Sequence, residues 1–314
     1  MTQSLRSVGF RAVASGWIAA AVLLGATAYV SAQGTLRKVY VSAVDKAGAP
    51  VKDMTAADFE VKENGKAQTV TAQPATSPLR LVLVVADGGT GAYQKATADL
   101  LNALGSKAEV KIVAVPERPE TLTDFTTNSA DLQAAVQRLG RQSAGRKSTQ
   151  VMEGLLEATK NLGAEDKRPV IVLMRAGGEA SSTLQADTLR DAMRKAGARF
   201  YVISPAGARS MAVNGASNKS GIGGIDQQNA NQETSDQYAQ LNQVLDDGSK
   251  ETGGRHEQTA AAGISAVIAQ IAAELQNEYE ITYTLPAGTK PGDKLQVTTK
   301  RKDVKIYAPS RLAN

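Results

Sequence analysis

The chain contains no cysteine, one histidine and few aromatic residues, which make up 4% of its 314 positions. The lack of cysteine excludes disulfides, thiol catalysis and thiolate metal sites. A formal net charge of only +5, with no dense basic run beyond Lys300–Lys302, argues against a nucleic-acid partner. The 42% of apolar residues is enough for a packed core, which excludes disorder throughout the chain.

Residues 1–32 have the pattern of a secretory signal peptide. Arg6 and Arg11 precede an apolar stretch at 13–30, and the small residues 30–32 form a cleavage site. We therefore expect an exported protein, periplasmic or extracellular. The alternative is an uncleaved anchor helix, because about 18 apolar residues approach the length that spans a bilayer. Such an anchor would be the only expected contact with a membrane.

An unbroken apolar run at 81–86 is followed by Asp87 and a turn that contains Gly89 and Gly91. A run without polar alternation predicts a strand of a parallel sheet that is covered on both faces. Asp87 then lies at the carboxyl end of the strand, where open α/β sheets bind their ligands. The turn lacks the third glycine of a dinucleotide-binding loop and no Gly-Lys-Ser/Thr follows, so we expect no nucleotide.

Strands and helices alternate over residues 78–277, which predicts an α/β domain with a mostly parallel sheet. Its strand cores are expected at 81–86, 110–115, 170–174 and 200–204. Short alternating strands instead fill 33–77 and 278–314. Because neither end makes a stable sheet alone, we expect the two ends to pair into one small β domain, with the α/β domain inserted between them.

Several short motifs follow one another in a characteristic order. They are Val44–Val51, Thr55–Val61, Glu63–Lys66, Leu81–Asp87, Gly253–Arg255 and Ile271–Tyr279. Together they resemble the von Willebrand factor type A (vWA) domain, and most closely the bacterial VWFA-related domain proteins. The resemblance covers nearly all of the chain after the expected signal peptide. It implies a Rossmann-like α/β fold and a protein-binding or adhesion role.

The resemblance also implies where a metal-ion-dependent adhesion site would lie. Its ligands in the family are an Asp-x-Ser-x-Ser motif, a Thr and a further Asp. Here the first Asp is Asp87, but the two serines are replaced by Gly89 and Gly91, and the last Asp by Ala176. Because Mg²⁺ needs several oxygen ligands, we expect no metal cofactor. Asp87 is then expected to cap the next helix or to accept backbone N–H bonds.

Polar residues expected near these ligand positions are candidates for partner binding. The family's Thr falls on Thr149, with Ser148 as the alternative, while Arg175 adds a positive charge and Glu179 a carboxylate. The partner-binding candidates are therefore Asp87, Thr149, Arg175 and Glu179.

Three functions are weighed. The first is metal-independent protein binding, in which an exposed loop expected at 210–233 overlies the site, unless that loop is a floppy insertion. The second is divalent-cation-dependent binding through Asp87 and Thr149. The third is a hydrolase, which is disfavoured because the only histidine, His256, is expected at a helix exit and no G-x-S-x-G elbow occurs. We favour the first, a non-enzymatic interaction module.

Overall fold

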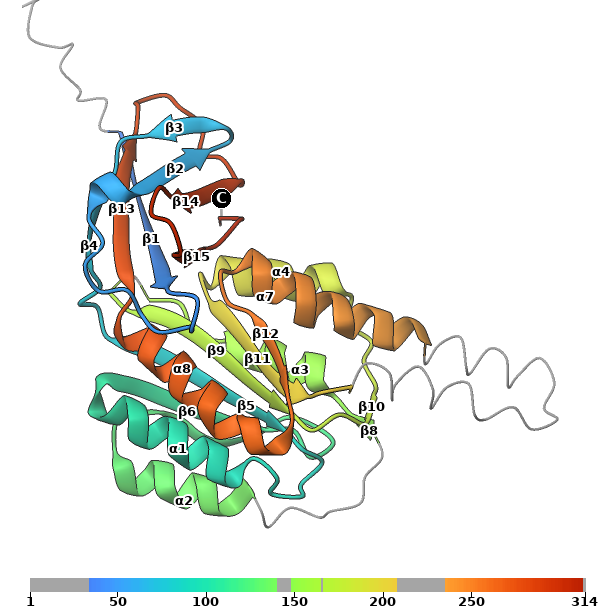
Figure 1. The fold of residues 1–314 in the computed structure, drawn as a ribbon. Coiled ribbons are helices and arrows are strands. Elements are labelled where there is room, and N and C mark those ends of the chain that lie inside the picture. Colours follow the sequence, from blue (N-terminus) through green and yellow to red (C-terminus); the bar gives the residue numbers. More distant parts are fainter. Residues whose placement is uncertain (1–33, 140–147, 165, 208–234, 313–314) are drawn as a thin grey trace, which may run out of the picture.

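The structure is a computed structural model and describes residues 34–139, 148–164, 166–207 and 235–312 (Figure 1). A larger α/β unit carries a small β unit at one end. The predicted fold class is confirmed, because the α/β unit is inserted between strands from the two terminal parts of the chain, which pair with each other. Among the described residues, no helix is long and apolar enough to cross a membrane.

Six strands form the central sheet, in the order β12-β11-β9-β5-β6-β7. They are β5 (Leu79–Ala86), β6 (Ala108–Ala114), β7 (Glu120–Thr126), β9 (Arg168–Arg175), β11 (Arg199–Pro205) and β12 (His256–Thr259). Neighbouring strands pair in parallel, except that β7 runs antiparallel to β6 at one edge. A two-residue parallel pair, β8 (Ser148–Thr149) and β10 (Glu179–Ala180), lies beyond the sheet.

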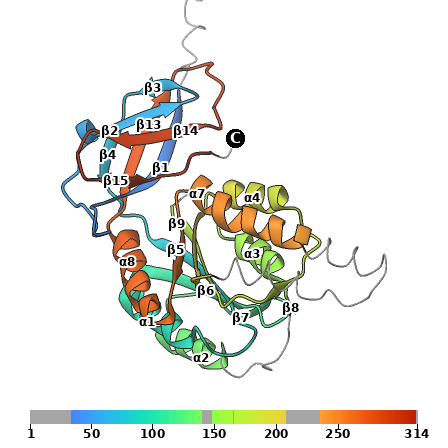
Figure 2. The ribbon, with the colours of Figure 1, turned by 45° about the vertical axis from the view of Figure 1, so that its right-hand side comes forward.

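Helices cover both faces of this sheet (Figure 2). One face carries α1 (Gln94–Leu104), α2 (Ser129–Leu139) and α8 (Ile264–Gln276), and the other carries α3 (Val151–Thr159), α4 (Ala186–Lys195) and a helix formed by 235–243, the π-helical segment η3 (Val244–Gly248) and α7 (Ser249–Glu251). Short 3-10 turns occur at η1 (Ala56–Asp58), η2 (Gly105–Lys107) and η4 (Ala261–Gly263). Strand β5 divides its side chains between the two cores, with Leu83 and Val85 in one and Val82 and Val84 in the other. This explains why its sequence shows no polar alternation.

The small β unit consists of two sheets with a shared core. One sheet has the order β15-β1-β13-β4 and the other β14-β2-β3. The strands are β1 (Thr35–Val44), β2 (Phe59–Glu63), β3 (Lys66–Gln68), β4 (Thr71–Pro74), β13 (Tyr279–Leu285), β14 (Leu295–Thr299) and β15 (Lys305–Tyr307). The turn between β2 and β3 has φ of +46° at Asn64 and +78° at Gly65. Both angles suit the Asn-Gly hairpin turn that the sequence predicts.

The structure adds one strand that the sequence did not predict and corrects one expectation. The edge strand β7 was not predicted, because only Leu122 in it is buried and the strand therefore lacks an apolar run. His256 does not lie at a helix exit but begins strand β12, which pairs in parallel with β11. The segment 210–233, expected to be an exposed loop, lies outside the described residues.

A cluster of buried charges joins the two units at the amino end of the parallel strands. Glu278 lies just before β13 and has a fully buried side chain. One of its oxygens is 2.6 Å from Nη1 of Arg168, and the other accepts a hydrogen bond from Arg199. Arg199 Nη1 also donates to Ser42 Oγ of β1 at 3.0 Å, so the same guanidinium contacts both units.

Candidate functional site

The predicted site residues lie at the carboxyl edge of the parallel sheet. Asp87 follows β5 and Arg175 ends β9, and these two strands are neighbours in register through Ala86 and Arg175. The backbone N–H of Ala176 donates to the carbonyl of Ala86 at 3.0 Å, which brings the two strand ends together. Thr149 is buried in β8, whose partner strand β10 follows the turn after β9. The topology therefore gathers Asp87, Thr149 and Arg175 on one edge.

Asp87 is 6% exposed, and its carboxylate accepts a hydrogen bond from the turn that follows β5. Its Oδ1 accepts the backbone N–H of Gly89 at 3.0 Å, while Oδ2 is buried and has no hydrogen-bond partner among the described residues. It does not cap the next helix, because α1 begins at Gln94, seven residues later by sequence number, and no side chain caps it. Of the two local roles expected for Asp87, backbone acceptance is the one observed.

The backbone conformation favours glycine at Gly89 and Gly91, the two positions where the family's metal motif has serine. The φ angles are +78° at Gly89 and +75° at Gly91. A side chain at such angles is strained, so restoring the two hydroxyls of the metal motif here would also require a different turn. The backbone conformation of the turn therefore favours glycine at both positions.

Arg175 is a buried cation without a carboxylate partner among the described residues. It is 4% exposed, Nη2 donates to the carbonyl of Gly178 at 2.7 Å, and Nε has no partner there. Burial lowers the pKa of the guanidinium, and the nearby Tyr238 and Tyr93 oppose this only in part. Burial, followed by the charge of Asp87, raises the pKa of Tyr93 to about 12. The Tyr93 hydroxyl donates to the backbone carbonyl of Arg175 at 2.9 Å.

The residues described at this edge do not fit a divalent cation. The described part of the chain contains no group of three or more His, Cys, Asp or Glu side chains that could hold a metal ion. At the ligand positions themselves, Gly89, Gly91 and Ala176 offer no side-chain oxygen. The buried charge of Arg175 would also repel a second cation nearby. The backbone of Glu179 belongs to β10, and its side chain lies outside what the structure describes.

The structure also brings together three polar side chains, Ser204, His256 and Asp246, which the sequence did not predict to meet. Ser204 Oγ is 2.8 Å from Nε2 of His256, and Nδ1 of the same ring is 2.8 Å from Oδ1 of Asp246. This is the connectivity of a Ser-His-Asp triad. Ser204 ends up beside His256 because β11 and β12 are adjacent, and Asp246 comes from the π-helical segment η3. No local sequence signal could have revealed it, since Ser204 and His256 are 52 positions apart.

The surroundings of this constellation differ from those of a hydrolase nucleophile. Ser204 is 2% exposed, and it lies within β11, immediately before Pro205. The nucleophile of an α/β-hydrolase instead lies on a sharp turn between strand and helix, with its hydroxyl exposed. Phe200 and Val202 of the same strand belong to the core under η3. The three residues therefore link η3 to the sheet.

Solved structures are the known proteins to which this chain shows similarity. No family model matches this chain, and no curated protein matches it. Among solved structures, it is similar to proximal thread matrix protein 1 from the mussel byssus, with 11% identity and a TM-score of 0.44 over 66% of this chain. The match covers 49% of the mussel protein, so this chain spans about half of that protein's length.

Two bacterial structures are similar at lower TM-scores. A von Willebrand factor type A protein from Catenulispora acidiphila shows 10% identity and a TM-score of 0.39, over 90% of this chain and 75% of that one. The protein BatB from Bacteroides thetaiotaomicron shows 10% identity and a TM-score of 0.38, over 63% of this chain and all of that one.

Proposed function

We propose that this chain is an exported, non-enzymatic protein-interaction module that binds its partner without a metal, through the carboxyl edge of its parallel sheet. The observation that carries the proposal is a pair of buried polar atoms, Asp87 Oδ2 and Arg175 Nε, which have no partner among the described residues. They lie at the ends of two neighbouring strands. A buried polar atom without a partner costs about 1–3 kcal/mol, so a protein that keeps two of them at a ligand-binding edge has a use for them.

The chemistry of the two groups indicates what a partner would supply. Arg175 suits a carboxylate, which its planar guanidinium can hold with two N–H donors. Asp87 Oδ2 suits a backbone or side-chain N–H. The glycines on either side of the site have positive φ, +65° at Gly88 and +98° at Gly177, and Ala176 between the strands' ends is exposed. Small, exposed turn residues let a partner approach the backbone closely.

The proposal is tested by recovering partners from an envelope fraction. Immobilised wild-type protein, Arg175→Met and Asp87→Ala would be compared in the presence of EDTA, with Lys66→Ala, an exposed change on the far β3, as the matched control. We expect the wild type and the control to retain the same protein and both site variants to lose it. Retention that requires added Mg²⁺ or Mn²⁺ would favour cation-dependent binding through Asp87 and Thr149 instead. Sequencing the amino terminus of the mature protein tests export, with residue 33 as the expected start.

A hydrolase is the second candidate, and the Ser204, His256 and Asp246 constellation is the observation that favours it. It ranks lower because the serine is buried within a strand. A fluorophosphonate probe, which labels activated serines, separates the two functions. We expect no labelling of the wild type. Labelling that disappears in both Ser204→Ala and His256→Ala would establish a nucleophile and overturn the non-enzymatic assignment.

A further inference from the structure

The turn that follows Arg175 is built from residues with little conformational restraint of their own. It leads from β9 to β10 through Ala176, Gly177 and Gly178, and the two glycines have φ of +98° and +90°. Glycine adopts such angles without steric cost, but it also has the most conformations to lose. Apart from its chain neighbours, no described residue has an atom within 4 Å of where a Cβ would lie on Gly177. The turn therefore needs contacts from elsewhere to keep one conformation.

Two tyrosine hydroxyls supply such contacts, one at each end of the turn. Tyr93 donates to the carbonyl of Arg175 at 2.9 Å, and Tyr238 donates to the carbonyl of Gly178 at 3.2 Å. Both tyrosines are buried, with exposed fractions of 2% and 8%. Because both acceptors are backbone carbonyls, the two hydrogen bonds fix the path of the main chain across the turn.

The two tyrosines approach the turn from opposite faces of the central sheet. Tyr93 immediately precedes α1 and belongs to the core that α1, α2 and α8 cover. Tyr238 belongs to the helix at 235–251, whose Leu241 and Val244 pack in the core on the other face. The turn is thus held between the two helical layers that Figure 2 shows.

The guanidinium of Arg175 depends on the same turn. Its Nη2 donates to the carbonyl of Gly178 at 2.7 Å, so one carbonyl accepts both this guanidinium and the Tyr238 hydroxyl. A carbonyl oxygen has two lone pairs, and the two donors use both of them. Nε of Arg175 has no partner among the described residues. The position of Nε therefore follows from where the turn holds Gly178.

Each of these hydrogen bonds also has an ordinary reason to exist, because a buried tyrosine hydroxyl usually finds a partner. That reason accounts for a bond to any carbonyl nearby. It does not account for two bonds that bracket the one turn on which an incompletely hydrogen-bonded, buried arginine depends. The two explanations also predict different results, since only a positioning role predicts a local change at Arg175.

We infer that Tyr93 and Tyr238 are positioning residues, which hold the turn at 175–178 from both sides and thereby fix Arg175 for the carboxylate of a partner. The inference rests on the proposed function, since it assigns the two tyrosines to the same carboxyl-edge site. A free glycine turn would have to be ordered when the partner binds, which costs affinity. With the turn ordered beforehand, the cost falls on folding instead of on binding.

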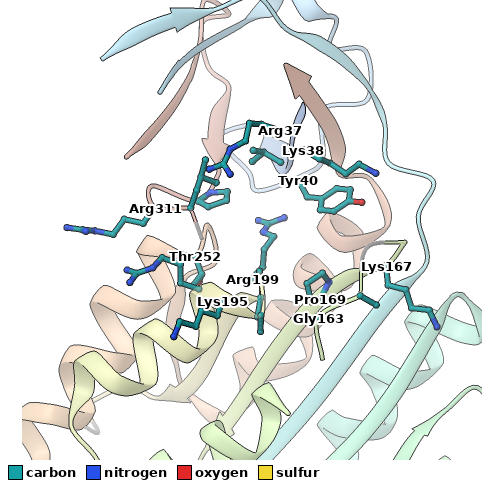
Figure 3. Close-up of a pocket in the computed structure, with 18 of the residues that line it drawn as sticks. Arg37, Lys38, Tyr40, Gly163, Lys167, Pro169, Lys195, Arg199, Thr252 and Arg311 are labelled. Carbon is teal, nitrogen blue, oxygen red and sulfur yellow. The ribbon is translucent and has the colours of Figure 1, made fainter. Parts of the chain in front are cut away.

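The first experiment measures the order of Arg175 without any partner. In ¹⁵N-labelled protein, each arginine Nε–H gives an NMR signal, and the signal that is missing from Arg175→Met belongs to Arg175. The rate of its hydrogen exchange with water is compared between the wild type, Tyr93→Phe and Tyr238→Phe. The internal reference is Arg199, which lines the cavity of about 520 Å³ between the β unit and the amino end of the sheet (Figure 3).

The matched control variant is Tyr279→Phe. The hydroxyl of Tyr279 is also buried and also donates to a backbone carbonyl, that of Val51 at 2.9 Å, but it lies in the β unit. This variant should leave the exchange of Arg175 unchanged. A change of Arg175 in the control as large as in the two site variants would overturn the inference.

We expect Tyr93→Phe and Tyr238→Phe each to speed the exchange of Arg175 by about three- to tenfold, the effect of losing one neutral hydrogen bond. The exchange of Arg199 should not change. Wild-type exchange of Arg175 in both variants would overturn the inference. So would an equal increase at Arg199, because it would indicate a general loosening of the fold.

A titration with sodium acetate connects this order to binding, with acetate in place of the partner's carboxylate and sodium chloride at equal ionic strength as the control. We expect acetate to shift the Arg175 signal of the wild type and to bind Tyr238→Phe about three- to tenfold more weakly. Equal affinity for the two proteins would overturn the positioning role alone and leave the proposed function standing. The lack of an acetate-specific shift in the wild type would overturn the carboxylate site itself, and the inference with it.

Discussion

Buried charged side chains form ion pairs at the amino end of the central sheet, whereas Asp87 and Arg175 at the carboxyl end form none among the described residues. At the amino end, Arg168 and Arg199 share the carboxylate of Glu278, and each guanidinium makes further hydrogen bonds to backbone carbonyls. At the carboxyl end, Arg175 has one hydrogen bond to a carbonyl, and neither it nor Asp87 has an ion-pair partner among the described residues. Buried arginine and carboxylate side chains are thus paired with each other at the amino end. At the carboxyl end they lack ion-pair partners among the described residues.

This difference distinguishes charged side chains that stabilise the fold from charged side chains that are available to bind a partner. A buried ion pair is strongly destabilised when one partner is removed, because the other is left uncompensated. Glu278, Arg168 and Arg199 hold the α/β unit and the β unit together at the amino end. The carboxyl end keeps incompletely paired groups, which add nothing to stability. Substitutions at the two ends, a pH titration and Mg²⁺ addition test this difference.

The largest effect is expected for Glu278→Gln. The side chain of Glu278 is fully buried, and the change removes the carboxylate that the guanidiniums of Arg168 and Arg199 share. We expect the free energy of unfolding to fall by about 3–5 kcal/mol, measured by urea denaturation at neutral pH. The matched control is Glu60→Gln, whose carboxylate is 50% exposed and 3.9 Å from Lys300. It should change stability by less than about 0.5 kcal/mol, and equal losses in the two variants would remove the special role of Glu278.

A change of opposite sign is expected for Arg175→Met. Because the guanidinium is buried without a carboxylate among the described residues, an apolar side chain of similar length should leave the free energy of unfolding unchanged or raise it by about 1 kcal/mol. Arg168→Met at the amino end is the comparison, and it should be destabilising because it leaves part of the Glu278 charge unpaired. A loss of more than about 2 kcal/mol in Arg175→Met would show that this arginine is structural.

A smaller effect should appear only at alkaline pH. The pKa of Tyr93 is raised to about 12 in the folded protein, whereas a tyrosine in an unfolded chain has a pKa of about 10. Between these values the unfolded state binds fewer protons than the folded state, so the contribution of Tyr93 to stability is lost as the pH rises from about 10 to about 12. Melting temperatures of the wild type and Tyr93→Phe should therefore converge over this window. Parallel curves would show that Tyr93 does not titrate in this way.

The smallest expected effect is that of Mg²⁺. A ligand that binds only the native state must raise the melting temperature, so millimolar Mg²⁺ is a direct test for a site at Asp87. We expect no shift, because the neighbouring motif positions Gly89, Gly91 and Ala176 provide no side-chain ligands. A rise that is present in the wild type and absent in Asp87→Ala would show that a metal binds after all, and would make the carboxyl end a cation site.

The sequence alone determined the elements that depend on local pattern. Unbroken apolar runs predict the central strands β5, β9 and β11, because a strand covered on both faces lacks polar alternation, and a mostly apolar run predicts β6. The Asn64-Gly65 pair predicts its hairpin, since few residues accept two successive positive φ angles. The position of Asp87 at the end of β5 follows from the same run. The sequence also shows directly that Gly89 and Gly91 stand where the family's metal motif has its two serines.

Contacts between residues that are distant in the sequence depend on the tertiary structure. His256 has no partner within its own segment, and it reaches Ser204 because β12 packs beside β11. Glu278 likewise meets Arg199 across 79 positions. The edge strand β7 has one buried residue, Leu122, and forms because β6 offers it a pairing edge, which local pattern does not encode. The physical reason is that hydrophobic periodicity reports which face of an element is buried, whereas pairing across elements is set by the packing of the whole chain.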